Sequence, residues 1–275
     1  MSRNRSPRTK FFVYVVESPS APDLYHQRGE GDLLRQILCL NGIPCITRCA
    51  VSREAVAAAL SLGIHEAMQQ FPDFVPILHI SAHGYSEGVE LSSGEHVTWA
   101  ELKEFLKPIN RALSNCLLVC MSSCNGYAGS RMAMWPQEQE LPFFAIVGNS
   151  DNPTWAETAA AYTCFYHRLA NGDFVVEAVE AMRIASGNES FYSTTAEDAR
   201  AGYMEYLKQV NVAEVRQQLE NNAYPPGAAK FAKRGDLVNE RGGPQVAREP
   251  GLPAVPETIS RSGGRMEEPI ARSAR

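Results

Sequence analysis

Apolar runs and amphipathic stretches alternate along this chain, and the pattern predicts strands that alternate with helices. Short continuous apolar runs rich in β-branched and aromatic residues are typical of strands buried on both faces. Such runs lie at residues 11–16, 43–51, 75–82, 116–122 and 142–147. Apolar residues at helical spacing predict helices at about 31–41, 52–70, 98–113, 154–170 and 173–186, with further helical sequence to about 222. We therefore expect an α/β fold, with a mostly parallel central sheet covered by helices on both faces.

Two local signals lie between the third and fourth predicted strands. Residues 89–91 and 96–98 are short strand-like segments separated by turn residues, which predicts a small hairpin. Thr98 then stands three residues before Glu101 at the start of a helical pattern. This spacing predicts a capping box, in which each of the two side chains bonds the other residue's backbone N–H.

Composition divides the chain into three regions. Residues 1–10 carry basic side chains and no acidic one, and form a basic N-terminal extension. Residues 11–222 hold the alternating pattern and are expected to form a single domain. Residues 223–275 are rich in Gly and Pro. Because such a segment buries too little apolar surface to offset its ordering entropy, we expect a disordered tail.

Charge and cysteine content narrow the function classes. The net charge is −5 although both ends are basic, so the body is strongly acidic and would repel nucleic-acid phosphates. The apolar run at residues 11–16 is shorter than the roughly 20 residues of a membrane span and the roughly 7–15 of a signal-peptide core. Seven cysteines, an odd number, indicate free thiols in a reducing compartment. We expect a cytoplasmic protein that binds neither nucleic acid nor membrane.

The candidate chemistry lies where two predicted strands end. His83 follows the third strand and Cys124 the fourth, each beside a glycine or one residue from it. In an open parallel sheet, ligands collect at the carboxyl ends of the strands, and neighbouring strands lie roughly 5 Å apart. Either residue alone is more typical of a structural role, but their joint placement favours a Cys–His pair for covalent acyl transfer. The N–H groups of Gly84 and Cys124 are the natural donors to the oxyanion.

These residues resemble a known family. The sequence has His83-Gly84 after a hydrophobic strand, then a hairpin, and then Ser-Ser-Cys-Asn-Gly after the next strand. This order is similar to that of caspase-like cysteine peptidases. It most resembles the bacterial CHAT branch, which is related to separase. The resemblance spans about residues 11–187, and residues 77–127 carry most of it. It implies a caspase–hemoglobinase fold and a His83–Cys124 dyad without an obligatory third member. It further implies endopeptidase activity without metal or cofactor, a protein substrate, and an activating protein partner in bacterial antiviral defence.

The sequence gives weaker signals for the residue that the substrate carries before the scissile bond. Related peptidases with basic specificity carry an acid two residues before the nucleophile, where this chain has Ser122. Asp151, after the fifth strand, is one candidate to line the first specificity pocket and favour Arg or Lys. Arg28, in the expected loop 17–32, would instead favour an acidic residue. Asp151 is slightly preferred.

A zinc site and two other functions are the alternatives to a peptidase. His79/His83 and Cys120/Cys124 offer four zinc ligands, but four residues of strand span roughly 13 Å, too far for bonds of about 2.0–2.3 Å. His79 and Cys120 are therefore expected to be mid-strand core residues. Ordinary structural roles are expected for the remaining cysteines, in the core, and for the remaining histidines: Cys39, Cys45, Cys49, Cys116, Cys164, His26, His65, His96 and His167. A non-catalytic module of the same fold and a thiol acyltransferase or hydrolase acting on small molecules stay open.

Overall fold

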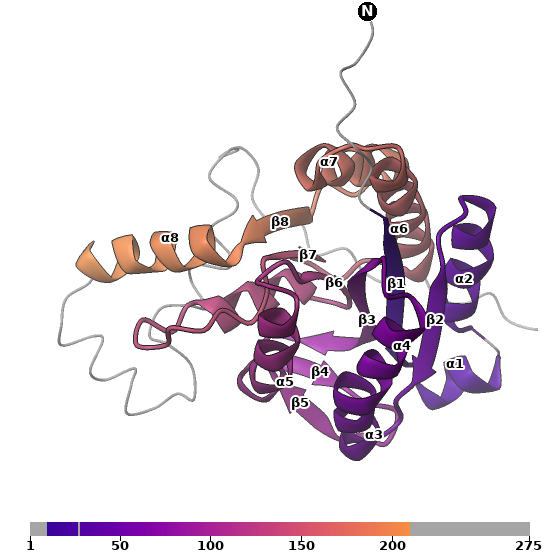
Figure 1. Ribbon diagram of the computed structural model, residues 1–275, viewed down its shortest axis with the longest axis horizontal. Coiled ribbons are helices and arrows are strands. Elements are labelled where there is room, and N and C mark those ends of the chain that lie inside the picture. The colour runs from indigo at the N-terminus through magenta and orange to yellow at the C-terminus, as the bar shows by residue number, and fades with distance from the viewer. Residues whose placement is uncertain (1–9, 27, 210–275) are drawn as a thin grey trace, which may run out of the picture. The chain divides into compact units, whose positions relative to one another are not determined.

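An eight-stranded sheet organises the described part of the molecule, with six strands side by side and the short strands β4 and β5 attached to the end of β3 (Figure 1). The computed structural model describes residues 10–26 and 28–209. The six side-by-side strands are β1 (Phe11–Ser18), β2 (Cys45–Cys49), β3 (Val75–Tyr85), β6 (Leu118–Ser122), β7 (Ala145–Asn149) and β8 (Phe191–Thr195), in the order β2-β1-β3-β6-β7-β8. Every neighbouring pair is parallel except β7 and β8. The predicted α/β class with a mostly parallel sheet is confirmed.

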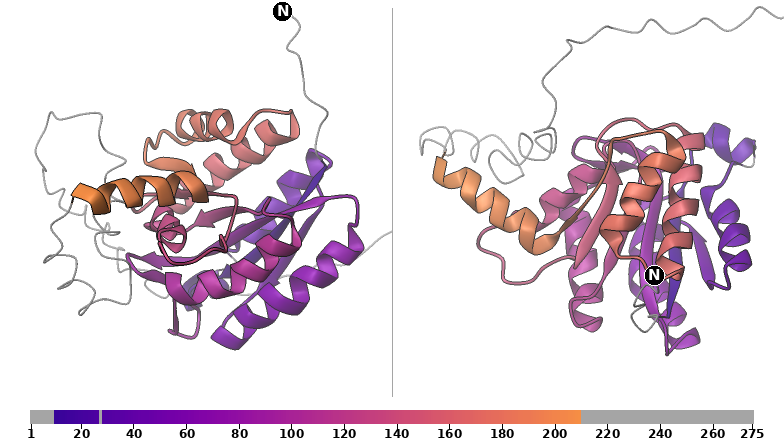
Figure 2. Two further views of the ribbon diagram at one scale, coloured as in Figure 1. Left: turned by 60° about the vertical axis from the view of Figure 1, so that its left-hand side comes forward. Right: turned by 90° about the horizontal axis from the view of Figure 1, so that it is seen from above.

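Helices cover both faces of this sheet, as Figure 2 shows from two sides. One face carries α2 (Glu30–Leu40), α6 (Trp155–Ala170) and α7 (Val175–Ser186); the other carries α3 (Arg53–Ala58), α4 (Ile64–Gln70), α5 (Trp99–Ala112) and α8 (Ala196–Gln209). The alternation of side chains along β1 divides the core accordingly. Phe12, Tyr14 and Val16 pack into one apolar cluster, and Val13 and Val15 into the other. Both clusters bury the continuous apolar strands that the sequence pattern indicated.

The hairpin and the helix after it form as predicted. β4 (Gly88–Glu90) pairs antiparallel with β5 (His96–Thr98), and the Thr98–Glu101 capping box begins α5. β3 runs three residues further than expected, because His83 to Tyr85 pair with β4. The hairpin therefore holds the end of the strand that carries His83.

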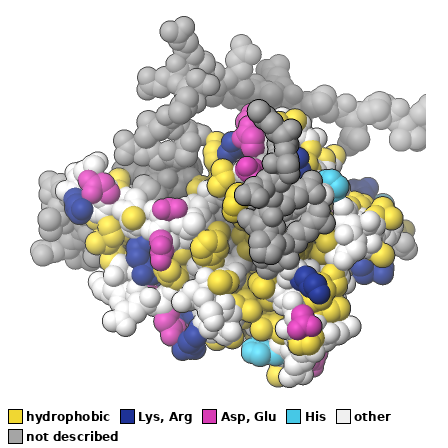
Figure 3. All heavy atoms as spheres, turned by 45° about the horizontal axis from the view of Figure 1, so that its top comes forward, with side chains coloured by type: hydrophobic (Ala, Val, Ile, Leu, Met, Phe, Trp, Pro, Cys, Tyr) yellow, Lys and Arg dark blue, Asp and Glu magenta, His cyan; other side chains and the backbone are white. Residues whose placement is uncertain are grey.

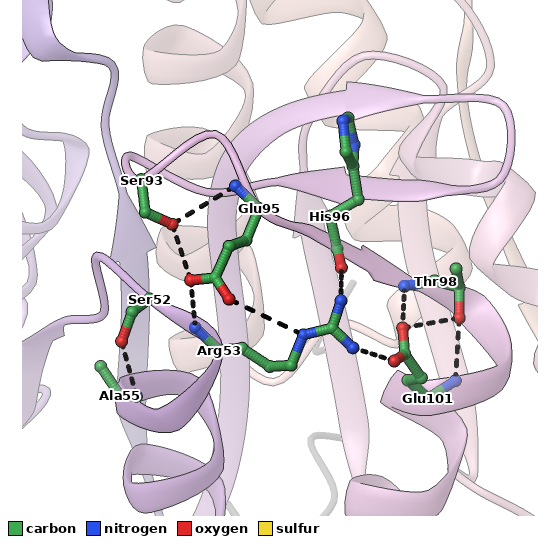
Figure 4. Close-up of polar contacts among 8 residues, drawn as sticks. All are labelled: Ser52, Arg53, Ala55, Ser93, Glu95, His96, Thr98 and Glu101. Atoms are coloured by element: carbon green, nitrogen blue, oxygen red, sulfur yellow. Dashed lines mark hydrogen bonds and ion pairs between the residues drawn. The ribbon is translucent and has the colours of Figure 1, made fainter.

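Arg53 at the start of α3 fastens this hairpin to the rest of the fold (Figure 4). Its backbone N–H donates to Glu95 Oε2 at 3.2 Å, and its guanidinium donates to the His96 carbonyl at 2.6 Å. The same guanidinium pairs with Glu101. One side chain thus joins α3, β5 and the first turn of α5.

Four elements depart from the sequence prediction. A short helix α1 (Ala21–Tyr25) lies within the expected loop 17–32, and a 3-10 helix η2 (Gly126–Ala133) follows β6. The expected helix at 52–70 is interrupted by a π-helical turn η1 (Ala59–Gly63), where the Tyr14 hydroxyl donates to the Ala59 carbonyl at 2.9 Å. Residues 191–195 form β8 and not helix, and the helical sequence expected beyond 209 lies outside the described residues.

Cysteine burial corrects another expectation. The apolar surroundings of five cysteines predicted core positions, but Cys39, Cys49 and Cys116 are exposed. Cys39 lies on the solvent side of α2, Cys49 ends the edge strand β2, and Cys116 precedes β6. Cys45 and Cys164 are half-buried. An apolar neighbourhood in sequence therefore did not distinguish the core side of an element from its outer side.

The surface and the ends of the chain complete the picture. Figure 3 shows Lys/Arg and Asp/Glu side chains interspersed on the face it presents, which gives that face no extended basic patch. None of the helices within residues 10–209 is long and apolar enough to cross a bilayer. The expected extension at 1–10, apart from Lys10, and the expected tail at 223–275 lie outside the described residues.

Candidate active site

The ends of β3 and β6 bring His83 and Cys124 together. The two strands are parallel neighbours, with His79 opposite Cys120 and Ser81 opposite Ser122, so the next positions in this register are 83 and 124. Both side chains line one pocket. The imidazole side chain is 47% exposed and the cysteine is half-buried, which leaves both within reach of a substrate from solvent.

The main chain around Cys124 is packed so tightly that glycine is required at two neighbouring positions, Gly84 at the end of β3 and Gly126 in the turn after Cys124. A Cβ built on Gly84 would lie 1.9 Å from the Cys124 carbonyl oxygen, and one built on Gly126 would lie 2.7 Å from the Met121 carbonyl oxygen. Asn125, which lies between Cys124 and Gly126 in the sequence, adopts a left-handed conformation with φ of 53°. These features turn the chain sharply directly after Cys124 and press it against the end of β3.

Electrostatics hold the resting thiol in its protonated form. Burial raises the pKa of the Cys124 thiol, and the negative charge of Asp151 raises it further. The backbone N–H groups of Cys124 and Gly84 act in the opposite direction and lower that pKa. Within the described chain, no hydrogen bond joins this thiol to the His83 imidazole. The thiolate must therefore form by proton transfer when a substrate is present.

Asp23 is a member of the site that the sequence analysis missed. Its Oδ2 lies 3.6 Å from His83 Nε2, and its side chain is only 10% exposed. Ser20 caps α1 and donates to the same oxygen at 2.5 Å, which fixes the carboxylate. With Nε2 facing Asp23, Nδ1 is the nitrogen that can exchange a proton with the thiol. The spacing Ser20-Ala-Pro-Asp23 is itself a helix-start signal that would have placed this carboxylate on a helix.

We expect Asp23→Asn to lower kcat about 10-fold, with little change in KM, for a reaction in which Cys124 and His83 act on a carbonyl, because the carboxylate orients the His83 imidazole. Asp32→Asn removes an exposed carboxylate from α2 and serves as the control. Steady-state kinetics on one acyl substrate checks the result. An unchanged kcat for Asp23→Asn would show that the imidazole needs no such partner.

The two residues considered for substrate preference lie apart from the pocket lining. Asp151 is exposed after β7, where its carbonyl accepts the Asn125 N–H at 2.8 Å and its N–H donates to Asn149 Oδ1. Arg28 is exposed and donates its N–H to the Asp23 carbonyl at 2.8 Å. The pocket itself is lined by Ala82, His83, Ser122, Ser123, Cys124, Pro153, Trp155 and Thr158. Asp151 acts on the thiol through its charge and helps to hold the turn after Cys124.

A buried polar cluster lies directly beneath this pocket. His79 and Cys120 are fully buried in mid-strand, as expected from the sequence. Glu30 Oε1 lies 3.6 Å from His79 Nε2 and accepts the Ser122 hydroxyl at 2.9 Å. Burial alone would raise the pKa of Glu30, but the charge of His79 and hydrogen bonds to the carboxylate outweigh it, so the pKa is lowered. The second His79 nitrogen is hydrogen bonded to the Tyr166 hydroxyl at 2.9 Å.

We expect Glu30→Ala to lower the free energy of unfolding by about 3–5 kcal/mol at pH 7, because it leaves His79 without its buried partner. The pKa of Glu30 is lowered by folding, so its contribution is present above the unfolded-state value of roughly 4.3 and is lost as the pH falls through the folded-state value. Glu30→Gln keeps the shape and is expected to lose less stability. Chemical denaturation from pH 3 to pH 7 measures both. Equal stability of Glu30→Ala and wild type would contradict this account of the cluster.

The described residues offer no cluster of metal ligands at this site. Among residues 10–26 and 28–209, no group of three or more His, Cys, Asp or Glu side chains is arranged to hold a metal ion. The His79/Cys120 pair is separated from the His83/Cys124 level of the same two strands by the Ser81/Ser122 pair. The arrangement instead presents a thiol, an imidazole and backbone donors at one pocket, which is suited to nucleophilic chemistry on a carbonyl.

Comparison with known proteins identifies no family for the chain. No protein-family model matches it, and no curated protein matches it in sequence. Among solved structures, the Arg-specific cysteine proteinase gingipain R aligns with a TM-score of 0.43 at 13% sequence identity. The alignment covers 65% of this chain and 44% of that one, so the chain spans less than half the length of the structure it matches. A likeness of this size assigns no activity, and the conclusion at this point is the α/β class with its mostly parallel sheet.

Proposed function

We propose that this chain is a caspase-like cysteine endopeptidase in which Cys124 is the nucleophile and His83 the general base and acid. The observation that carries the proposal is the shared pocket at the ends of β3 and β6, lined by both side chains, with the Gly84 backbone packed closely against that of Cys124. The resemblance of the residues around 77–127 to caspase-like peptidases of the CHAT branch supports the same assignment.

The reaction proceeds through a thioester. His83 takes the thiol proton as Sγ attacks the peptide carbonyl carbon, and the N–H groups of Gly84 and Cys124 hold the oxyanion. The imidazolium then gives its proton to the leaving amine as the C–N bond breaks. Water, deprotonated by His83, attacks the thioester, the C–S bond breaks, and the carboxylate product leaves with the thiol restored. Asp23 positions the His83 imidazole in both steps.

The cellular setting is part of the proposal. The seven cysteines are free, which suits a reducing cytoplasm. Activation by a protein partner and cleavage of a protein substrate rest on the resemblance to caspase-like peptidases. A role in bacterial antiviral defence rests on the resemblance to CHAT peptidases alone.

A second function is favoured by one specific observation. The thiol is protonated at rest and not hydrogen bonded to His83 within the described chain, as in a caspase-like module that has lost catalysis and serves as a regulator or docking scaffold. Such a module would leave Cys124 unreactive. The exposed imidazole and the glycine-only backbone contact between Gly84 and Cys124 favour the enzyme, because a docking scaffold has no need of either.

The test is cleavage of a randomised peptide library by the full chain, followed by mass spectrometry of the new termini. We expect cleavage that stops when the protein is first treated with iodoacetamide, with Cys124 among the alkylated residues. Cleavage that persists after complete alkylation of Cys124 would overturn the assignment. Absence of cleavage, together with an unreactive Cys124, would favour the regulatory module.

A further inference from the structure

The pocket beside Cys124 has a buried floor and an exposed mouth. Ala82, Ser122, Ser123 and Thr158 are each at most 7% exposed. His83 and Trp155 are far more open, at 47% for the imidazole side chain and 40% for the tryptophan. A side chain that enters this pocket beside Cys124 therefore ends among residues shielded from water.

Volume limits what this pocket can hold. Its cavity measures about 100 Å³. A protein cavity of roughly 150 Å³ accommodates benzene. The space beside Cys124 is thus suited to an aliphatic side chain smaller than an aromatic ring. A long cationic side chain such as that of arginine would not fit wholly within this space.

The polar groups of the floor are neutral, and two of the three hydroxyls are already engaged. Ser122 donates to the buried Glu30 carboxylate, and Thr158 donates to the Trp155 carbonyl at 3.0 Å. Ser123 Oγ is buried and has no hydrogen-bond partner. Glu30 lies behind Ser122 and pairs with His79, so it does not line the cavity. A charged side chain would lose its hydration at the floor and find no charged partner among the floor residues Ala82, Ser122, Ser123 and Thr158.

We propose that this pocket receives the substrate side chain that precedes the scissile bond, and that it selects a small uncharged side chain such as Ala, Thr, Val or Leu. The inference rests on the proposed peptidase function and adds the substrate class to it. Asp151, which the sequence favoured for a basic preference, lies outside the lining of the cavity.

The experiment is a set of peptides identical except at the position before the bond, which carries Ala, Thr, Val, Leu, Phe, Asp, Lys or Arg. We expect kcat/KM for the best small uncharged residue to exceed that for Asp, Lys, Arg and Phe by about 10-fold or more. Preferential cleavage after Lys, Arg, Asp or Phe overturns the pocket assignment while the peptidase stands. No cleavage of any peptide overturns the proposed function and the pocket's role with it.

Two substitutions at Thr158 separate the pocket from its surroundings. Thr158→Leu extends a longer side chain into the cavity and is expected to reduce kcat/KM for Val and Leu peptides about 10-fold while cleavage after Ala persists. Thr158→Val keeps the shape and is expected to leave the preference unchanged. Asp151→Asn is likewise expected to leave it unchanged. A preference that shifts in Asp151→Asn, or stays the same in a folded Thr158→Leu, would place the selecting residue elsewhere.

Discussion

Replacing Cys124 with alanine is expected to lower peptide cleavage by about 10⁴-fold or more, to background. In the proposed reaction the sulfur is the atom that forms the covalent intermediate, and Cys124 is the one cysteine among the residues that line the pocket with His83. The substitution removes one half-buried sulfur and should leave the thermal unfolding temperature within a few degrees of wild type. Kinetics on the best library peptide and a thermal melt measure both effects.

Cys116→Ala is the matched control, because Cys116 is exposed and precedes the same strand β6. It is expected to retain the wild-type rate. Residual cleavage by Cys124→Ala above background, or an equal loss in Cys116→Ala, would remove Cys124 from the chemistry.

Gly84→Ala is expected to lower kcat/KM roughly 10³-fold. The added methyl group would lie 1.9 Å from the Cys124 carbonyl oxygen and 2.9 Å from the Cys124 nitrogen, both backbone atoms that cannot rotate away. The end of β3 must then separate from the turn after β6, which moves an oxyanion donor away from the sulfur. The loss should appear mainly in kcat, since the pocket floor from Ser122 to Thr158 is not touched.

Gly29→Ala provides the comparison, because its φ is −97° and an added Cβ would meet Glu17 Oε2 at an ordinary 3.4 Å. We expect it to keep nearly full activity. Wild-type kcat in a folded Gly84→Ala protein would show that the close approach of the two backbones has no part in catalysis.

The sequence was enough to bring His83 and Cys124 to one pocket, because the order in which strands end is a property of the topology. Two apolar strands ending in His83 and Cys124 can only bring them together as parallel neighbours, and β3 and β6 are such neighbours. The capping box at Thr98 and the hairpin were predictable for a similar reason, since each depends on contacts only a few residues apart. Short-range signals and strand order therefore determined which strands, hairpin and helix surround the site.

Contacts between distant segments could not be predicted in this way. Asp23 reaches His83 from a five-residue helix after β1, and its distance depends on how α1 docks against the end of β3. The floor of the pocket combines Ser122 from β6 with Thr158 from α6, which no local pattern relates. β8 was missed because its aromatic and threonine-rich pattern lies between two helical stretches, and only its pairing with β7 settles its structure.

The most direct measurement is the rate and position at which a peptidyl acyloxymethyl ketone modifies the protein, compared between wild type and His83→Ala. The peptide ends in the residue that the library favours, and peptide mapping locates the adduct among Cys124 and the exposed Cys39, Cys49 and Cys116. We predict a single adduct on Cys124 that forms about 10²-fold more slowly in His83→Ala. Modification of an exposed cysteine in place of Cys124, or a rate at Cys124 unaffected by the loss of His83, would contradict the proposed peptidase.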